Sequence, residues 1–421
     1  MKPLIIILGA LVVIGLTFIL VTTQSSLQAE KEEVKTAASH SKHLWKETSL
    51  ATPEIKPAVS TKVSNMPLEE KITQLLYVGV EGTSLAPSEE QMIADGRVGG
   101  VIFLGRNIQN TDQLQTLVNE AKKANESNPT PMFLGVDEEG GRVSRIPTPL
   151  KKLPSSYKIG SENDPELAFT AGKLLARKVK AFGLNMNFAP VLDINNNPEN
   201  QVIGDRSFGN TPKHVTQMGV AEMRGIQSEG IIPVLKHFPG HGDTSVDSHV
   251  NLPVIEKSMS QIDDFELKPF KEAIDQGAEA VMTAHILFPE LDKAQPATFS
   301  STIIQNLLRE KANFDGLVIT DDMGMGAISK NYGTNEATVK AIQAGSDMVL
   351  LTDTRNGNFD KVKEALLKAV KEGTISKKQI DDSVTRILRT KEKYNLSKDE
   401  QTEIDFEQLN EQITKLRNET N

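Results

Sequence analysis

The stretch IIPVLKHFPGHGDTSVDSH, residues 231–249, decides how the rest of the chain is interpreted. Its first five residues are apolar and rich in β-branched side chains, the pattern of a buried strand. A loop with two glycines and a proline follows, and it carries the titratable residues Lys236, His237, His241, Asp243, Asp247 and His249. Because titratable groups crowded behind a buried strand are costly to a fold, we interpret this stretch as a functional loop.

Composition places the chain among globular proteins. It has 421 residues, of which 38% are hydrophobic and 24% charged, values typical of folded domains. The formal net charge of −9 argues against nucleic-acid binding and gives no reason to expect attachment to an anionic membrane surface. The absence of cysteine excludes disulfides, thiolate metal sites and a cysteine nucleophile. It does not exclude export.

Outward from this stretch, eight apolar runs alternate with helical patterns. The predicted strands are 75–80, 100–104, 132–136, 186–192, 232–237, 280–284, 317–320 and 347–351. The predicted helices include 111–123, 166–182, 212–228, 260–276, 302–311, 327–344, 359–371 and 377–393. Continuous apolar strands that alternate with helices indicate a parallel α/β sheet. Eight such units over about 330 residues favour a (β/α)8 TIM-type barrel.

The termini are expected to lie outside this barrel. Leu4–Val21 is almost wholly apolar and just long enough to span a bilayer, so residues 1–23 are predicted to be a transmembrane anchor or signal segment. Residues 24–65 are predicted to be a flexible spacer. The barrel domain is assigned to 66–396, and 397–421 to a helical tail in which Asp405 is the N-cap. We expect a membrane-anchored, outward-facing monomer, or a secreted one if the segment is cleaved.

Titratable side chains follow six of the predicted strands at the same end. Because catalytic groups of such barrels lie at the C-terminal ends of the strands, we expect these side chains to converge. They are Asp137, Glu138, Glu139, Arg142, Arg145, Asp193, Lys236, His237, His285, Asp321, Asp322 and Asp353. Single members have structural alternatives: Asp321 or Asp322 could cap the next helix, and His285 could be a hydrogen-bonded core histidine.

Three reaction types suit such a rim. A zinc hydrolase would use the three loop histidines with Asp243 or Asp247, but the first strand lacks the His-x-His pair usual for such barrels. Schiff-base chemistry would need a neutral Lys236, which the neighbouring acids would keep charged. Glycoside hydrolysis needs a carboxylate nucleophile, a proton donor and side chains that hold hydroxyl groups. The third reaction fits best.

Seven segments carry a resemblance to a known family. They are VDEEGGRVSRI, APVLDI, IGDRSFG, KHFPGHGDTSVDSH, MTAHI, LVITDDMGM and AGSDMVLL. In this order the sequence resembles glycoside hydrolase family 3, in its single-barrel β-N-acetylglucosaminidase (β-N-acetylhexosaminidase) form. The resemblance covers about residues 66–395, and KHFPGHG followed by Asp-x-His is its most specific part.

The resemblance implies a retaining mechanism and a role for each matching residue. Asp321 matches the nucleophile, and Asp247 with His249 matches a loop dyad that replaces the usual carboxylic acid. The matches to sugar-binding residues are Asp137, Arg145, Arg206, Lys236 and His237. No metal and no cofactor are implied.

The expected activity is removal of β-linked N-acetylglucosamine from peptidoglycan fragments or related amino sugars, with Asp321 forming the covalent glycosyl-enzyme. A β-glucosidase of the same family remains an alternative. A metal-dependent hydrolase and a non-catalytic barrel that binds cell wall are two further alternatives. The intact Asp321, Asp247 and His249 argue against the non-catalytic one.

Overall fold

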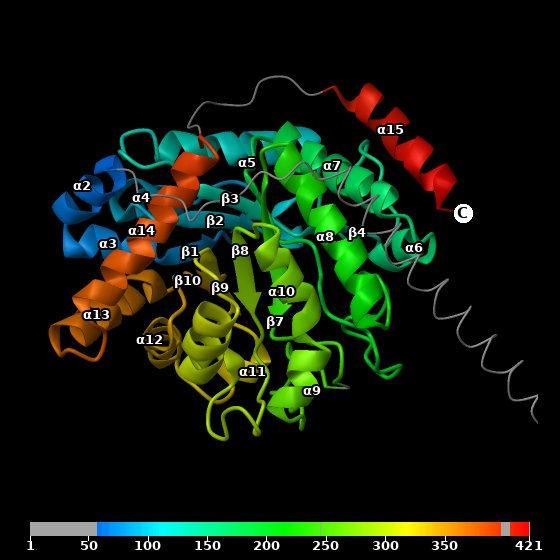
Figure 1. Cartoon of the computed structure of the whole chain (residues 1–421). Helices are drawn as coiled ribbons and strands as arrows, with labels where there is room; N and C mark the ends of the chain where they lie inside the picture. The colour runs from blue at the N-terminus through cyan, green and yellow to red at the C-terminus, as the bar shows by residue number, and fades with distance from the viewer. Residues whose placement is uncertain (1–56, 245, 397–404, 421) are drawn as a thin grey trace, which may run out of the picture. The chain divides into compact units, whose positions relative to one another are not determined.

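The computed structural model describes residues 57–244, 246–396 and 405–420 (Figure 1). The predicted membrane segment Leu4–Val21 and residues 24–56 of the predicted spacer lie outside the described residues. None of the helices in the described part of the chain is long and apolar enough to cross a membrane.

Eight parallel strands close into a barrel, as the alternating pattern predicts. Around the ring they run in chain order: β1 (Leu76–Gly79), β2 (Gly100–Phe103), β3 (Phe133–Val136), β6 (Met186–Asn187), β7 (Ile232–Phe238), β8 (Ala280–Thr283), β9 (Leu317–Asp322) and β10 (Met348–Leu351). Pairing of β10 with β1 closes the ring. A short antiparallel hairpin, β4 (Glu138–Gly140) with β5 (Val143–Ser144), follows β3.

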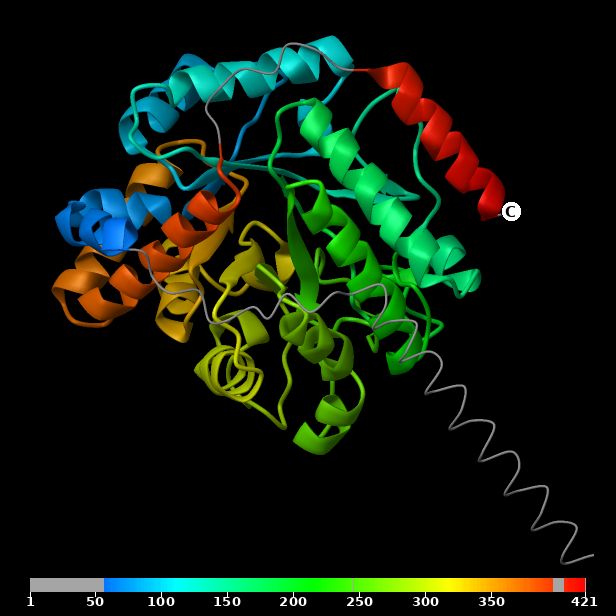
Figure 2. The ribbon, with the colours of Figure 1, turned by 45° about the horizontal axis from the view of Figure 1, so that its top comes forward.

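Helices occupy the connections between strands and surround the ring in Figures 1 and 2. They are α2 (Pro57–Asn65), α3 (Leu68–Gln74), α4 (Pro87–Gly96), α5 (Thr111–Ala124), α6 (Ser156–Ser161), α7 (Pro165–Ala181), α8 (Pro212–Ser228), α9 (Met259–Asp264), α10 (Leu267–Asp275), α11 (Gly326–Ser329), α12 (Thr334–Ala344), α13 (Asn358–Lys371), α14 (Lys377–Lys393) and α15 (Phe406–Glu419). In the described residues there are also four short or irregular helices: η1 (Gly105–Asn107), η2 (Gly204–Arg206), η3 (Ala297–Phe299) and the π-helical η4 (Thr302–Lys311).

Three predicted elements differ in extent because a proline or glycine interrupts them. The strand predicted at 186–192 is regular only over Met186–Asn187, and its pairing with β7 returns as an isolated bridge at Val191, after Pro190, which has no N–H to give to the ladder. The helix predicted at 260–276 is divided into α9 and α10, because Pro269 in the first turn of α10 cannot donate to the carbonyl of Phe265. The helix predicted at 327–344 is divided into α11 and α12, and Gly333 precedes the second piece.

Helix α2 lies before the domain start predicted at residue 66 and packs against the barrel's outer helices. Val59 and Val63 on this helix are buried. The helix packs against α14, which ends the barrel, and both views show the two side by side (Figures 1 and 2). In the sequence, the apolar pattern of α2 consists of Val59 and Val63 alone, and two valines within a polar stretch do not indicate a helix. Only the packing partner far along the chain identifies it.

In the tail the structure contains one described helix, α15. The side chain of Asp405 accepts a hydrogen bond from the Gln408 amide, as an N-cap does. Leu409, Ile413 and Leu416 are buried, and the Phe406 ring lies 6.0 Å from that of Phe182. The tail thus packs against the outer helical layer at α7.

The packing of α2 can be tested with one buried and one exposed substitution. Val63→Asp places a charge in the buried contact with α14, so it should lower the free energy of unfolding by at least about 2 kcal/mol. Thr61→Asp on the exposed side of the same helix should change it little. Thermal unfolding of the two variants gives the comparison, and equal melting temperatures would mean that α2 is not part of the domain.

Candidate active site

The titratable side chains converge at the C-terminal rim of the barrel, where two strands lose their regular register. The pairing of β7 with β8 shifts between Leu235 and Phe238, at Lys236 and His237. The pairing of β10 with β9 shifts between Met348 and Leu350, opposite the end of β9, where Asp321 lies. Such irregularities re-aim side chains and are common beside active sites. They affect three of the predicted site residues.

A chain of buried ion pairs occupies one side of the rim. Lys236 Nζ lies 2.7 Å from Asp137 Oδ1 and 2.7 Å from Glu139 Oε1. Arg206 binds the same Glu139 carboxylate with two parallel hydrogen bonds, each 2.8 Å long. Asp137 and Glu139 face the same partner because alternate residues of an extended segment point to one side. The predicted sugar-binding residues Asp137, Lys236 and Arg206 are therefore brought together.

This network keeps Glu139 and Lys236 charged. Burial raises the pKa of Glu139, but the charges of Arg206 and Lys236 lower it more, so the net pKa lies far below its usual range. Burial lowers the pKa of Lys236, but the charges of Asp137 and Glu139 raise it by more, so the net shift is upward. Lys236 is therefore an ammonium group at neutral pH. Schiff-base chemistry needs a neutral amine, so the lysine alternative is disfavoured.

A buried carboxylate, Asp193, fixes the start of the functional loop. Its Oδ2 lies 2.7 Å from His237 Nδ1, and its Oδ1 accepts a 2.7 Å hydrogen bond from the His241 amide. Burial raises the pKa of Asp193, but His237 more than offsets this and the net pKa is lowered. Since the carboxylate accepts the proton of Nδ1, the other ring nitrogen of His237 is left for a ligand.

His241, by contrast, is a structural residue of the loop. Burial, with the neighbouring His237, lowers its pKa to about 4, so the ring is neutral at physiological pH. Its Nε2 lies 3.1 Å from the hydroxyl of Ser248, which precedes His249. The ring therefore links the start of the loop to its end.

Two arginines on the β4–β5 hairpin have different tasks. Arg142 donates to the carbonyl oxygens of Gln201, Val202 and Ile203 at 2.9, 2.8 and 3.0 Å, and so holds the segment that leads to Arg206. Arg145 follows the hairpin and lies against Gly105. Its Nε is buried and has no hydrogen-bond partner among the described residues. A buried donor without a partner is consistent with a ligand-binding role for Arg145.

The two aspartates at the end of β9 are engaged differently. Asp322 accepts bonds from the Thr352 hydroxyl at 2.6 Å, the Thr352 amide at 3.2 Å and the Gly324 amide at 3.1 Å, so its carboxylate ties β9 to β10. The recorded hydrogen bond to the Asp321 carboxylate comes from the next amide in the chain, at 2.8 Å. Asp321 is therefore the one of the pair that can approach a substrate.

Neighbouring imidazoles keep Asp321 ionised. Burial raises its pKa, but His285, His237 and the Asp322 amide lower it more, so the net pKa lies below the usual value. His285 is itself buried, and burial lowers its pKa below 6.5. Its Nε2 lies 3.0 Å from the Asp322 carbonyl, which can only accept, so the proton is on Nε2. His285 thus holds the backbone beside Asp321, and the interpretation as a hydrogen-bonded core histidine is confirmed.

Asp247 and His249 form a pair at the outer edge of the rim. His249 Nδ1 lies 2.9 Å from Asp247 Oδ1, which also accepts the His249 amide at 2.8 Å. Burial raises the pKa of Asp247, but the His249 amide and ring together lower it more, so the net pKa lies below its usual value. The two side chains are exposed, at 44% for Asp247 and 64% for His249. The pair is thus open to solvent, unlike the ion-pair network.

Both ends of the loop are attached to the barrel domain. The carbonyls of Ser248 and His249 accept bonds from the first amides of α11, those of Ala327 and Gly326, at 3.0 Å each. A side chain at Gly326 would place its Cβ 2.6 Å from the His249 carbonyl, so only glycine allows this approach. At the other end, Lys257 Nζ binds Asp243 at 2.6 Å and Glu266 at 2.5 Å. The helix α11 follows β9, and His249 lies close enough to Asp321 for its charge to lower the pKa of that carboxylate.

Sequence reasoning gave no role to three residues that build the site. Glu139, Asp193 and Lys257 bind Lys236, His237 and the loop respectively. Glu139 and Asp193 were expected at the rim without a role, and Lys257 was not selected at all. The alternation from Asp137 to Glu139 was a usable signal for the first. Asp353, in contrast, pairs with the exposed Arg355, and within the part of the chain that the structure describes no hydrogen bond or ion pair joins it to the site residues. It was grouped with the rim only because it follows the eighth strand.

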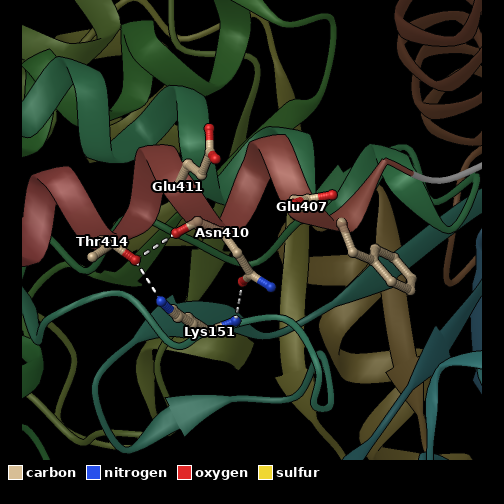
Figure 3. Close-up of a pocket in the computed structure, with 6 residues that line it drawn as sticks. Lys151, Glu407, Asn410, Glu411 and Thr414 are labelled. Atoms are coloured by element: carbon tan, nitrogen blue, oxygen red, sulfur yellow. Dashed lines mark hydrogen bonds between the residues drawn. The ribbon is translucent and has the colours of Figure 1, made fainter.

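The pocket drawn in Figure 3 lies elsewhere. It is lined by Lys151 and by residues of α15, and it shares no residue with the rim. Lys151 donates from its amide to Asn410 at 2.8 Å and from Nζ to Thr414 at 2.6 Å (Figure 3). These bonds fasten the tail to the segment after the β4–β5 hairpin. The pocket is therefore a gap in the contact between α15 and the segment at Lys151, and it lies apart from the titratable residues of the rim.

The metal alternative finds no set of ligands in the described part of the chain. No three histidine, aspartate or glutamate side chains there are grouped as a metal site requires. The three loop histidines are separated in environment, because His237 and His241 are buried and His249 is exposed.

Three comparisons with known proteins agree with this geometry. Residues 67–390 match the sequence model of the Glycosyl hydrolase family 3 N terminal domain. "Beta-hexosaminidase A" of Pseudoalteromonas piscicida is 34% identical over 74% of this chain, and the chain spans 56% of that protein. "Beta-hexosaminidase" of Thiobacillus denitrificans is 39% identical over 66% of this chain and 77% of its own length.

Solved structures give the same result. A glycoside hydrolase family 3 beta-N-acetylglucosaminidase from a Paenibacillus strain superimposes with a TM-score of 0.80 at 38% identity. The match covers 84% of this chain and 69% of that one. The family match extends over most of the described barrel, and the residues that form its rim are those in the matching segments. The chain therefore belongs to glycosyl hydrolase family 3.

Proposed function

We propose that the chain is a retaining β-N-acetylhexosaminidase that removes β-linked N-acetylglucosamine. One observation carries this proposal: an ionised aspartate with few bonds, Asp321, shares a rim with a solvent-facing His–Asp pair. That combination supplies a nucleophile and a proton donor, the two groups that glycoside hydrolysis needs. The names of the similar proteins support the amino-sugar substrate.

In the first step a carboxylate oxygen of Asp321 attacks the anomeric carbon. The glycosidic C–O bond breaks, and the leaving oxygen takes a proton from His249. Because His249 Nδ1 faces Asp247, the donated proton is on Nε2. Asp247 stabilises the protonated ring before the transfer and fixes its orientation.

In the second step water attacks the anomeric carbon of the glycosyl-enzyme. His249 accepts the proton of that water, and the bond between sugar and Asp321 breaks to return the free carboxylate. The network of Asp137, Lys236 and Arg206, with His237 and Arg145, holds the sugar hydroxyls throughout. Fixed charges already paired in the free enzyme need no reorganisation when the sugar arrives.

The activity itself can be tested together with the nucleophile. The chain should hydrolyse a chromogenic β-N-acetylglucosaminide faster than the matching β-glucoside, with no loss in EDTA. Asp321→Asn should lower kcat at least about 10³-fold with an unchanged melting temperature, whereas Asp322→Asn should lower the melting temperature because it loosens β10.

Each alternative has its own outcome in this assay. Preference for the glucoside would favour a β-glucosidase, activity lost in EDTA a metal-dependent hydrolase, and no turnover a binding barrel. A slow fluoro-sugar should label Asp321, and a label on Asp322 or Asp137 would overturn the assignment.

The role of the dyad predicts a dependence on the leaving group. His249→Ala should lower kcat about 10²- to 10⁴-fold for alkyl or sugar leaving groups, which need protonation. The loss should be far smaller for activated aryl glycosides, whose departure needs little help. Asp247→Asn should give the same pattern at smaller size, because the ring remains. Equal losses on both kinds of substrate in steady-state kinetics would mean that the two residues only fold the loop.

We also propose that the protein acts outside the membrane, held there by the apolar segment Leu4–Val21, and that its substrates are peptidoglycan-derived. The segment is long enough to span a bilayer, and an outward-facing enzyme would meet the amino-sugar polymers of the wall. Cell fractionation should find the activity with membranes, and deletion of residues 1–28 should move it to the soluble fraction at unchanged kcat. Loss of folding on deletion would mean that this segment belongs to the domain.

A further inference from the structure

Glu138 is the middle residue of the acidic run Asp137–Glu138–Glu139, yet it points away from the sugar side of the rim. Its side chain is fully buried and pairs with the equally buried Lys178 of α7, with Nζ 2.5 Å from Oε1. The backbone of Glu138 is fixed separately. The side-chain Oδ1 of Asn187 on β6 accepts a hydrogen bond from the Glu138 amide at 3.0 Å, and its Nδ2 donates to the Glu138 carbonyl at 2.9 Å. The carboxylate is therefore not needed to hold its own strand.

The carboxylate instead holds the returning strand of the β4–β5 hairpin. Besides Lys178 it accepts bonds from the Ser144 hydroxyl at 2.7 Å and from the amides of Arg145 and Ile146 at 2.8 and 2.9 Å. Two of these donors are consecutive backbone groups, so they define the position of the chain at Arg145. Arg145 is also the rim residue whose Nε has no partner among the described residues.

We propose that Glu138 and Lys178 are positioning residues that set the guanidinium of Arg145 for sugar binding. The proposal rests on the proposed function, because it assigns Arg145 to the sugar. Lys178 neutralises a carboxylate that would otherwise be a lone buried charge, and the carboxylate in turn provides acceptors for the Arg145 and Ile146 amides. Neither residue touches the sugar. An ion pair outside the site would thus determine affinity inside it.

Two double variants separate the acceptor role from the buried charge. Glu138→Gln with Lys178→Met, and Glu138→Ala with Lys178→Met, both remove the ion pair and leave no unpaired charge. They differ in one respect, since only glutamine can still accept from the amides of Arg145 and Ile146. We expect KM for a β-N-acetylglucosaminide to rise about tenfold in the alanine variant, the size of one lost hydrogen bond to a charged group. The glutamine variant should stay close to the parent.

A double-mutant cycle shows whether the effect passes through Arg145. In an Arg145→Ala background the alanine and glutamine variants should have the same KM, because the group that they position is gone. Asp347→Asn is the matched control for stability. Asp347 is a buried carboxylate that also accepts four groups, from Arg309, Val318, Ser383 and Arg386, but it lies at the opposite end of β10. It should lower the melting temperature and leave KM unchanged.

The outcomes keep the two proposals apart. If the parent protein neither hydrolyses nor binds an amino sugar, measured by calorimetry with N-acetylglucosamine, the proposed function fails first. If the parent is active and the alanine and glutamine variants have equal KM, or if their difference persists without Arg145, the positioning role is wrong. The positioning role is supported if KM rises tenfold only in the alanine variant, and only when Arg145 is present.

Discussion

The hydrogen bonds between β1 and β10 close eight parallel strands into a ring, and the site depends on that closure. A closed parallel ring has one rim at which all strands end, so residues that follow different strands meet there. Asp137 and Lys236 are 99 positions apart in the chain and 2.7 Å apart in space. The helices near the closing strands bring the two ends of the domain together in the same way, since α2 and α3 pack against α14. Without closure, the residues that follow β7 would not lie opposite those that follow β3 and β9.

The rim is divided by burial. On one side Asp137, Lys236, Glu139 and Arg206 are paired with one another, because buried charges without partners are too costly to keep. On the other side Asp247 and His249 are exposed and form a single bonded pair. Asp321 lies between these regions with few bonds and a lowered pKa. This division by burial suits the proposed two-step hydrolysis: the paired side can hold a neutral sugar without moving, while the proposed proton-transfer groups can reach both a leaving group and water.

Much of this plan could be predicted from the chain, and the failures have physical causes. The eight strands were predictable because strands buried on both faces are continuous apolar runs. Element ends were not predictable at Pro190, Pro269 and Gly333, where one residue overrides a longer pattern. Helix α2 was missed because two buried valines in a polar stretch acquire meaning only from α14. Glu139 and Asp193 were expected at the rim but received no role, because each acts through another residue there, and a residue's partner is not visible in its neighbours along the chain.

The sequence by itself determined the family pattern, the order of the strands and the set of chemistry-bearing residues, since these depend on residue type and spacing alone. It indicated Asp321 rather than Asp322 only through resemblance. The tertiary structure supplied the reason: Thr352, at the end of the next strand, takes up the carboxylate of Asp322 and leaves that of Asp321 open. In the same way, only the fold turned Glu138 toward Lys178 and its two neighbours toward Lys236. Three consecutive acids are equivalent in a sequence, and they become different when each side chain meets the cation that its direction allows.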